Sequence, residues 1–293
     1  MPRFIVPEVI QTSAMDCGPA SLKALLEGFG VPISYGRLRE ACQTDVDGTS
    51  IDTMESTAVA LGLQAEQIMV PLDHLLLPES KCLPAIVVVR LSSQATHFVV
   101  VWRRHGSYLQ VMDPAVGRRW IRASEFLHDV HLHIQAVPVE AWREWAGGEQ
   151  FIRGLNARLK AIGISDDSFT RKALDDAGWK ALGALDAATR MTTALVDSGA
   201  VRRGKSAAAL ISNLEPEEIP PSYWSVLANP QDEETVGMRG AVLVRAIKVS
   251  VEHNRQALPE DLRAALDEKP ARPLAEVWRT IREDGLLAPA AIA

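Results

Sequence analysis

Cysteine is scarce in this 293-residue chain, which contains three cysteines, Cys17, Cys42 and Cys82. An odd number does not suit a disulfide framework, and no pair has the Cys-x-x-Cys spacing of a structural zinc site. Each cysteine is therefore interpreted alone. We expect Cys42 and Cys82 to be small buried hydrophobic residues, as most free cysteines are.

Long hydrophobic runs are also missing. The longest run, residues 83–89, falls far short of the roughly 20 apolar residues that cross a bilayer, so no membrane-spanning segment is predicted. The first residues lack the apolar stretch and small-residue cleavage site of a secretory signal. These two absences predict a cytoplasmic location.

An excess of positive charge is absent as well, because 31 basic and 37 acidic residues give a net charge of −6. Residues 1–137 and residues 138–293 each carry a net charge of −3, and only short basic pairs such as Arg118-Arg119 stand out. A surface that binds nucleic acid needs a basic face or stripe. Nucleic acid is therefore not expected as a partner.

What is present suits a folded protein, since 47% of the residues are apolar and 23% are charged. Helical spacing after the capping candidate Asp16 predicts a helix over residues 16–28, with shorter helices at 35–42 and 51–61. Segments rich in Val and Ile then predict the strands of an antiparallel sheet. These strands cover residues 83–91, 97–102, 108–112 and 132–137. The first part is therefore expected to be α+β.

Beyond Pro138 the pattern becomes mainly helical, up to a proline-rich break at residues 215–221. The helices are expected at residues 142–145, 151–162, 168–182, 185–196 and 206–214. Two strands (223–227 and 241–249) and two helices (260–266 and 274–283) are expected after the break. We thus predict an α+β domain over 1–137, a helical region over 138–214 and a small α+β tail over 215–293.

Cys17 is a candidate nucleophile because it directly follows Asp16 at the expected start of a helix. Free backbone N–H groups and the positive end of the helix dipole lower the pKa of a thiol at such a position. The competing interpretation, a small buried cysteine, is the more common one when only this position is considered.

His97 and Asp113 are expected to meet in a hairpin. Both are equidistant from position 105, which lies in the turn-like stretch 104–107. A hairpin with that centre would set the two side chains directly opposite each other, with Cβ atoms roughly 5 Å apart. The carboxylate would then orient the imidazole as in a catalytic triad, although a purely structural pair is the alternative.

Gln11 lies six residues before Cys17, where its side-chain amide can join the Cys17 N–H in an oxyanion hole. Together with the segments Asp16-Cys17-Gly18-Pro19-Ala20, Thr96-His97-Phe98-Val99-Val100-Val101 and Asp113-Pro114-Ala115-Val116-Gly117, this sequence resembles the bacteriocin-processing, papain-like cysteine peptidases that cleave double-glycine leaders. The resemblance covers about residues 5–136. It departs from the pattern at Ser21, where many members have a second cysteine.

The resemblance implies a papain-like fold in which N-terminal helices pack on an antiparallel sheet. It implies that Cys17 is the nucleophile, His97 the general base and acid, Asp113 the orienting residue and Gln11 the oxyanion donor. The implied enzyme is a cysteine endopeptidase that needs no cofactor or metal and cuts ribosomal peptide precursors after a Gly-Gly or Gly-Ala pair.

Most relatives carry this peptidase as the cytosolic front domain of an ABC exporter, so an exporter membrane component is a possible partner at the inner face of the membrane. Residues 220–289 resemble, less specifically, the segment before the first membrane helix of some larger exporters. Two alternatives remain open: a module that binds leader peptides without cutting them, and acyl transfer to a nucleophile other than water on the same triad.

Two further patterns are discounted. Residues 199–206 match the spacing of a phosphate-binding P-loop, but the preceding residues have helical spacing where that motif requires a strand, so we expect a turn between helices. His128, His131 and His133 lack nearby carboxylates or thiolates, which favours a solvated strand edge over a metal site.

Overall fold

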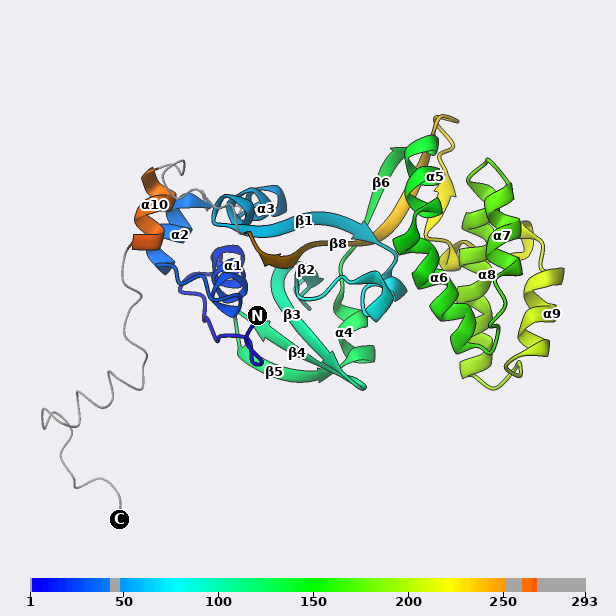
Figure 1. The fold of residues 1–293 in the computed structure, drawn as a ribbon, viewed down its shortest axis with the longest axis horizontal. Helices are drawn as coiled ribbons and strands as arrows, with labels where there is room; N and C mark the ends of the chain where they lie inside the picture. The colour runs from blue at the N-terminus through cyan, green and yellow to red at the C-terminus, as the bar shows by residue number, and fades with distance from the viewer. Residues whose placement is uncertain (1, 43–47, 251–259, 268–293) are drawn as a thin grey trace, which may run out of the picture.

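The computed structural model describes the whole chain except residues 1, 43–47, 251–259 and 268–293. Figure 1 shows two lobes joined by a narrow connection. The first lobe contains α1–α3 and most of a sheet, and the second contains α5–α9. A long strand near the end of the described chain, β8 (Thr235–Val249), runs from one lobe into the other.

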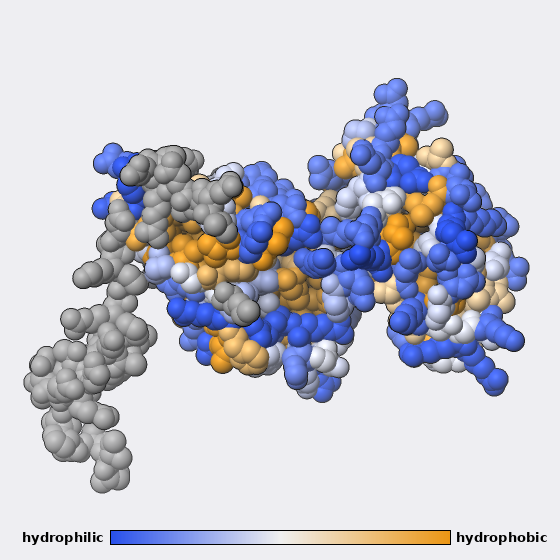
Figure 2. Space-filling view, viewed as in Figure 1, coloured by the Kyte–Doolittle hydropathy of each residue, from blue (hydrophilic) through white to orange (hydrophobic). Residues whose placement is uncertain are grey.

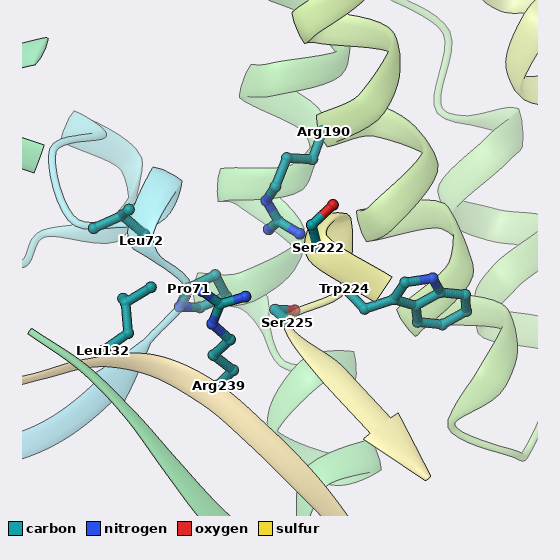
Figure 3. Close-up of a pocket in the computed structure, with 8 residues that line it drawn as sticks. All are labelled: Pro71, Leu72, Leu132, Arg190, Ser222, Trp224, Ser225 and Arg239. Carbon is teal, nitrogen blue, oxygen red and sulfur yellow. The ribbon is translucent and has the colours of Figure 1, made fainter. Parts of the chain in front are cut away.

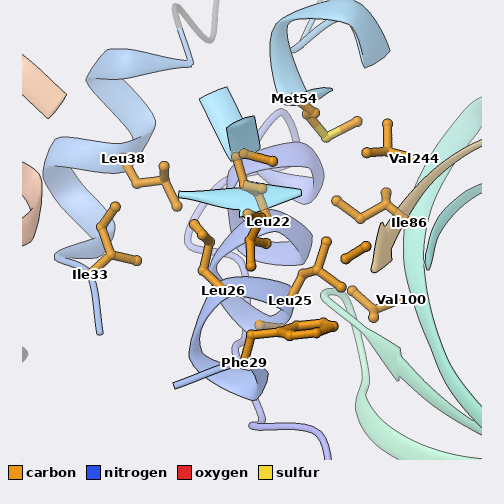
Figure 4. Packing of buried hydrophobic residues seen from close by; sticks show 14 of the residues in the cluster. Leu22, Leu25, Leu26, Phe29, Ile33, Leu38, Met54, Ile86, Val100 and Val244 are labelled. Carbon is orange, nitrogen blue, oxygen red and sulfur yellow. The ribbon is translucent and has the colours of Figure 1, made fainter. Parts of the chain in front are cut away.

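The first lobe begins with three helices, α1 (Cys17–Gly28), α2 (Tyr35–Ala41) and α3 (Ile51–Ala60), as expected from the sequence. Leu22, Leu25 and Leu26 of α1 are fully buried because their helical spacing places them on one face of the helix. Figure 4 shows them packed among side chains from the other helices and from the sheet, including Ile86 and Val100. This core fixes α1, and hence Cys17 at its first turn, against the sheet.

The sheet has the strand order β1-β8-β2-β3-β4-β5, with β6 and β7 paired only to β8. The remaining strands are β1 (Leu63–Val70), β2 (Ala85–Arg90), β3 (Thr96–His105), β4 (Tyr108–Asp113), β5 (Gly117–Arg122), β6 (Leu132–Pro138) and β7 (Val226–Ala228). The sequence analysis missed β1 and β5, whose many polar and charged residues hid the strand pattern. It also missed α4 (Ala123–Asp129).

β8 has partners in both lobes. Its second half pairs with β1 and β2 inside the main sheet, and its first half pairs with β6 and β7. The division of the chain at 137/138 and 214/215 stays a prediction, but a strand of the third predicted segment lies within the sheet of the first. The helix expected at 274–283 falls outside the described residues.

The second lobe is built from α5 (Val139–Gly147), α6 (Glu149–Ala161), α7 (Ser168–Asp175), α8 (Lys180–Asp197) and α9 (Lys205–Asn213). The break expected at residues 182–185 is wrong, because α8 continues through it. A short helix, α10 (Glu260–Asp267), follows β8 and contacts α2 of the first lobe. Within the described ranges no helix is both long and apolar enough to cross a membrane.

A buried ion-pair network joins the loop after β1 to α6 and α8. Arg158 and Arg190 each donate hydrogen bonds to Asp73 and to Asp186. Ser225 Oγ donates a further hydrogen bond to Asp186 Oδ2, at a distance of 2.5 Å. Asp186 is completely buried. Since a buried charge is costly unless it is paired, this network fixes the helices of the second lobe against the loop that leads to β2.

Candidate active site

Cys17 opens α1 and is partly exposed. The expected capping role of Asp16 is wrong: its carboxylate makes no bond to the helix N-terminus and instead accepts from Thr12 Oγ1 at 2.8 Å and Arg39 Nε at 2.7 Å. Gly18, two residues after Asp16, packs so closely against Thr49 that a Cβ at position 18 would lie 2.9 Å from Thr49 Cβ. The first turn of α1 is therefore not capped by Asp16, and the Gly18 backbone helps to lower the pKa of Cys17.

His97 connects Cys17 to Asp113. Its Nε2 lies 2.8 Å from Asp113 Oδ1, and on its other side His97 and Cys17 shift each other's pKa. Because Nε2 faces the carboxylate, Nδ1 is the ring nitrogen left for the thiol. His97 is 4% exposed and Asp113 is 5% exposed, so these contacts are largely shielded from water. The structure thus brings together the three residues that the sequence analysis selected.

The expected register of the hairpin is nevertheless wrong. Val100 pairs with Met112, and this register, continued by one residue, places Asp113 opposite residue 99 rather than opposite His97. His97 and Asp113 are therefore diagonal neighbours. Diagonal positions are about 7–8 Å apart, which long side chains can span.

A β-bulge at Trp102 decides which face of the sheet carries Asp113. The register shifts by one between Val101 and Arg103. Without this shift Asp113 would lie opposite residue 100, on the other face from His97, because a slip of one residue exchanges the two faces. The bulge is thus what makes the His97–Asp113 contact possible.

The three side chains influence one another's ionisation. Burial acts to raise the pKa of the Cys17 thiol, but hydrogen bonds from His97 and from the backbone of Phe98 and Gly18 leave it below its ordinary value. Burial acts to lower the pKa of His97, whereas its bonds to Asp113 and Cys17 raise it to about 9. These opposite shifts favour a thiolate beside an imidazolium at neutral pH.

Asp113 accepts further hydrogen bonds from its own turn and from β5. Ala115 N donates to Oδ1 at 2.9 Å and Arg119 Nη2 to Oδ2 at 3.1 Å. Burial acts to raise the pKa of Asp113, but the bonds from His97 and Ala115, with the charges on His97 and Arg119, hold it below its ordinary value. The sequence analysis noted Arg119 only as half of a basic pair, because the strand that carries it was not predicted.

Gln11 lies on a segment tied to the turn that follows Asp113. Its N–H donates to Pro114 O at 2.9 Å, and nearby Glu8 accepts from Arg118 N at 3.0 Å through Oε2. The side-chain oxygen of Gln11 is buried and has no hydrogen-bond partner among the described residues. Gln11 is thus held beside the Asp113 turn, and its role as an oxyanion donor stays a prediction.

The chain is similar to known proteins over the part that contains this site. The model of the Peptidase C39 family matches residues 6–129. An uncharacterized protein of Methanothermobacter marburgensis is 32% identical over 128 residues, which cover 43% of this chain and 85% of that protein. The chain belongs to the Peptidase C39 family. It is thereby a member of a cysteine peptidase family, as the resemblance of its motifs implied.

Other relatives are much longer than the matched region. The Lactococcin-G-processing and transport ATP-binding protein LagD of Lactococcus lactis is 32% identical over 118 residues, which cover 40% of this chain and only 17% of LagD. A double glycine motif protease from an AMS/PCAT transporter, solved in complex with the leader peptide, is 27% identical, with a TM-score of 0.38 and coverage of 44% of this chain and 88% of its own.

The remaining cysteines differ from Cys17 in their surroundings. Cys42 and Cys82 are each 1% exposed, and burial raises the pKa of both thiols to about 12. A thiol with such a pKa stays protonated and unreactive at neutral pH. The prediction that these two cysteines are small buried residues is confirmed.

The P-loop-like segment takes its expected form, whereas the histidines do not share one strand edge, because His128 lies on α4. Residues 199–204 form the connection between α8 and α9, so no strand precedes the P-loop-like segment. His133 lies on β6 and His131 directly precedes it; their ring centroids are 4.5 Å apart, and His131 Nδ1 lies 2.8 Å from Arg90 Nη2. No group of three potential metal ligands occurs in the part of the chain that the structure describes.

Three of the cavities in the described part of the chain, among others, lie away from the Cys17 thiol. The smallest, of about 150 Å³, separates Arg190 of α8 from Arg239 of β8, and Figure 3 shows both side chains reaching toward it. One of about 290 Å³ is lined mainly by apolar residues such as Met69 and Trp142, and one of about 540 Å³ lies beside His131. In the view of Figure 2, apolar surface gathers around α1 in the first lobe and near α6 in the second. None of these three cavities is lined by a residue of the Cys17–His97–Asp113 group.

Proposed function

We propose that this protein is a cysteine endopeptidase that removes leader segments from ribosomal peptide precursors by cutting after a Gly-Gly or Gly-Ala pair. Cys17 would be the nucleophile, His97 the general base and acid, Asp113 the orienting residue and Gln11 an oxyanion donor. The observation that carries the proposal is the grouping of the partly exposed Cys17, His97 and the buried Asp113, in which His97 bonds to Asp113 and the pKa values of Cys17 and His97 shift each other.

The ionisation states support attack by a thiolate. With the pKa of Cys17 lowered and that of His97 raised to about 9, the sulfur can attack the scissile carbonyl carbon without first passing a proton to solvent. The carbonyl oxygen then becomes an oxyanion, which the Cys17 N–H and the Gln11 side chain would stabilise. Asp113 keeps the imidazolium oriented throughout.

His97 would complete the reaction by first donating a proton and later taking one up. The imidazolium donates its proton to the leaving amine as the C–N bond breaks, which leaves an acyl-enzyme on Cys17. Neutral His97 then takes a proton from water, the resulting hydroxide attacks the thioester, and the thiolate leaves as the imidazolium is restored. The products are the leader with a new carboxyl end and the free core peptide.

The substrate class and partners are part of the proposal. The names of the relatives support them, since LagD is named for processing and transport of a peptide and the solved double glycine motif protease was bound to a leader peptide. Glycine at the cleavage site would suit a narrow approach to Cys17. An ABC exporter at the inner face of the cytoplasmic membrane is the proposed partner.

The test uses a synthetic precursor whose leader ends in Gly-Gly, with products identified by mass spectrometry. The full chain should cut after the pair, and Cys17→Ala should not, whereas Cys42→Ala serves as the matched control and should cut normally. If neither the unchanged chain nor Cys17→Ala cuts but both bind the leader, the protein is a leader-binding module. Cleavage by Cys17→Ala would refute the assignment of the nucleophile.

A further inference from the structure

Arg119 of β5 reaches across to the far side of the Asp113 carboxylate. Asp113 pairs with Gly117 in the β4–β5 ladder, so Arg119 lies two residues farther along β5, on the same face of the sheet. Its Nη2 is 3.1 Å from Asp113 Oδ2. The Arg119 side chain is 47% exposed and that of Asp113 is 7% exposed.

The two carboxylate oxygens of Asp113 have different partners. Oδ1 accepts from both His97 Nε2 and Ala115 N, while Arg119 is the partner of Oδ2. Each oxygen is thereby assigned a direction: Oδ1 toward the imidazole and Oδ2 toward β5. The carboxylate cannot rotate without breaking a charge-assisted hydrogen bond on one side.

We propose that Arg119 is a positioning residue of the catalytic site, which holds the Asp113 carboxylate so that Oδ1 faces His97 Nε2. The inference rests on the proposed function, since it takes Asp113 as the residue that orients His97. Arg119 acts through Asp113 and is not a catalytic residue itself.

Burial explains why such a residue is needed. If Arg119 were absent, Oδ2 would be a charged acceptor in a site that admits little water, with no other donor bonded to it among the described residues. A carboxylate in that position lowers its free energy by turning toward any available hydrogen-bond donor. This rotation would weaken its hydrogen bond to His97. The other charged groups near Asp113 are His97 and, beyond it, Cys17, while Glu8 is bonded to the N–H of Arg118.

The charge on Arg119 has the same effect as its hydrogen bond. It is one of the influences that keep the pKa of Asp113 low, although a half-exposed guanidinium is screened by water and contributes modestly. An ionised Asp113 in turn helps to keep His97 protonated and Cys17 ionised. The rate at which Cys17 reacts at a pH below the ordinary pKa of a thiol therefore measures the effect of Arg119. This measurement needs no peptide substrate.

The experiment measures the rate at which iodoacetamide alkylates Cys17 at pH 6, resolved by site with mass spectrometry. Arg119→Met should lower this rate about tenfold, as expected for the loss of one partly screened hydrogen bond to a charged group. Arg119→Lys, whose ammonium can donate to the same oxygen, should recover most of the rate. Arg122→Met, on the exposed end of the same strand, is the matched control and should leave the rate unchanged.

The decisive comparison repeats Arg119→Met in an Asp113→Ala background. If Arg119 acts through Asp113, adding Arg119→Met to the Asp113→Ala variant should change the alkylation rate by less than about twofold. An undiminished tenfold effect would refute the proposal, because Arg119 would then act on Cys17 or His97 directly. Thermal unfolding of each variant shows whether it is folded.

Cleavage of the Gly-Gly precursor provides the second readout. Arg119→Met should lower kcat by about the same factor as the alkylation rate and leave KM within about twofold, since Arg119 is not expected to touch the substrate. A change confined to KM would instead identify Arg119 as a substrate contact and refute the positioning role. If the unchanged chain does not cut the precursor, the proposed function fails, but the alkylation experiment still tests Arg119.

Discussion

Two polar networks in this molecule shift the pKa values of their members, yet they have different properties. The Cys17–His97–Asp113 group ends at a partly exposed cysteine, and the pKa of His97 rises to about 9. The network around Asp186 is closed, and there burial and neighbouring arginines lower the pKa of His74 to about 4. A shifted pKa is therefore not enough to identify an active site; an accessible nucleophile must belong to the network.

The two networks also differ in how their charges are balanced. Around Asp186 two carboxylates and two guanidinium groups neutralise one another, and the pKa of Asp73 falls while that of Arg190 rises. Such a set holds fixed charges and has no group that titrates near neutral pH. In the first lobe a proton is shared between Cys17 and His97, which is the property that acyl transfer requires.

The largest difference should appear when one histidine of each network is replaced by alanine in separate variants. His97→Ala removes the general base and acid, so cleavage should fall about 10³-fold or more, as for other triad members. His74→Ala removes a ring that is 2% exposed and packs on Phe151 with centroids 5.0 Å apart, so it should lower the free energy of unfolding and leave cleavage within about twofold. Cleavage kinetics and urea unfolding distinguish the two variants; a comparable loss of cleavage in both would contradict the separation of the networks.

Breaking the closed network should be the next largest effect. Asp186→Ala leaves Arg158 and Arg190 with one carboxylate fewer in a buried site, and breaking a buried pair from one side costs about 3–5 kcal/mol of unfolding free energy. Urea unfolding measures this loss, with the exposed Asp175→Ala as control. Alkylation of Cys17 should stay at the wild-type rate in folded protein, and a loss below about 1 kcal/mol would show that the network adds little to stability.

The sequence predicted the site better than the sheet around it. Cys17, His97 and Asp113 could be found because a helix start and two strand ends are local patterns, and the structure brings all three together. The place of β8 could not be found, since pairing with β1 and β2 joins segments far apart in the chain and no local pattern states which strands become neighbours.

Small departures from regular structure were also out of reach. The bulge at Trp102 adds one residue to a strand that otherwise looks continuous, yet it determines the face on which Asp113 lies. Arg119 was missed for the same reason as β5: its strand is rich in arginine and lacks the alternation of a half-buried strand.

The third and smallest effect is a difference in how the two networks respond to pH. His74 has a pKa of about 4 when folded against 6.5 ordinarily, so the unfolded chain binds more protons between these values and stability falls as the pH drops from 6.5 to 4, by about 3 kcal/mol. His97 has a raised pKa, so its own contribution is present below 6.5 and is lost as the pH rises through about 9.

Cys17 offsets that alkaline loss. Because the pKa of Cys17 is lowered in the folded protein, the unfolded chain keeps the thiol proton to a higher pH, and this counters the alkaline loss of stability from His97. Cleavage should nevertheless decline above about pH 9, where His97 loses the proton that the leaving amine needs, while alkylation of the thiolate should not decline.

Urea unfolding of the wild type and of His74→Asn from pH 4 to 9 tests the acid side. Below pH 6.5 the unfolding free energy of the variant should no longer fall as the pH drops. A parallel decline of alkylation and cleavage above pH 9 would instead indicate that the site itself opens, and the two networks would then not be independent.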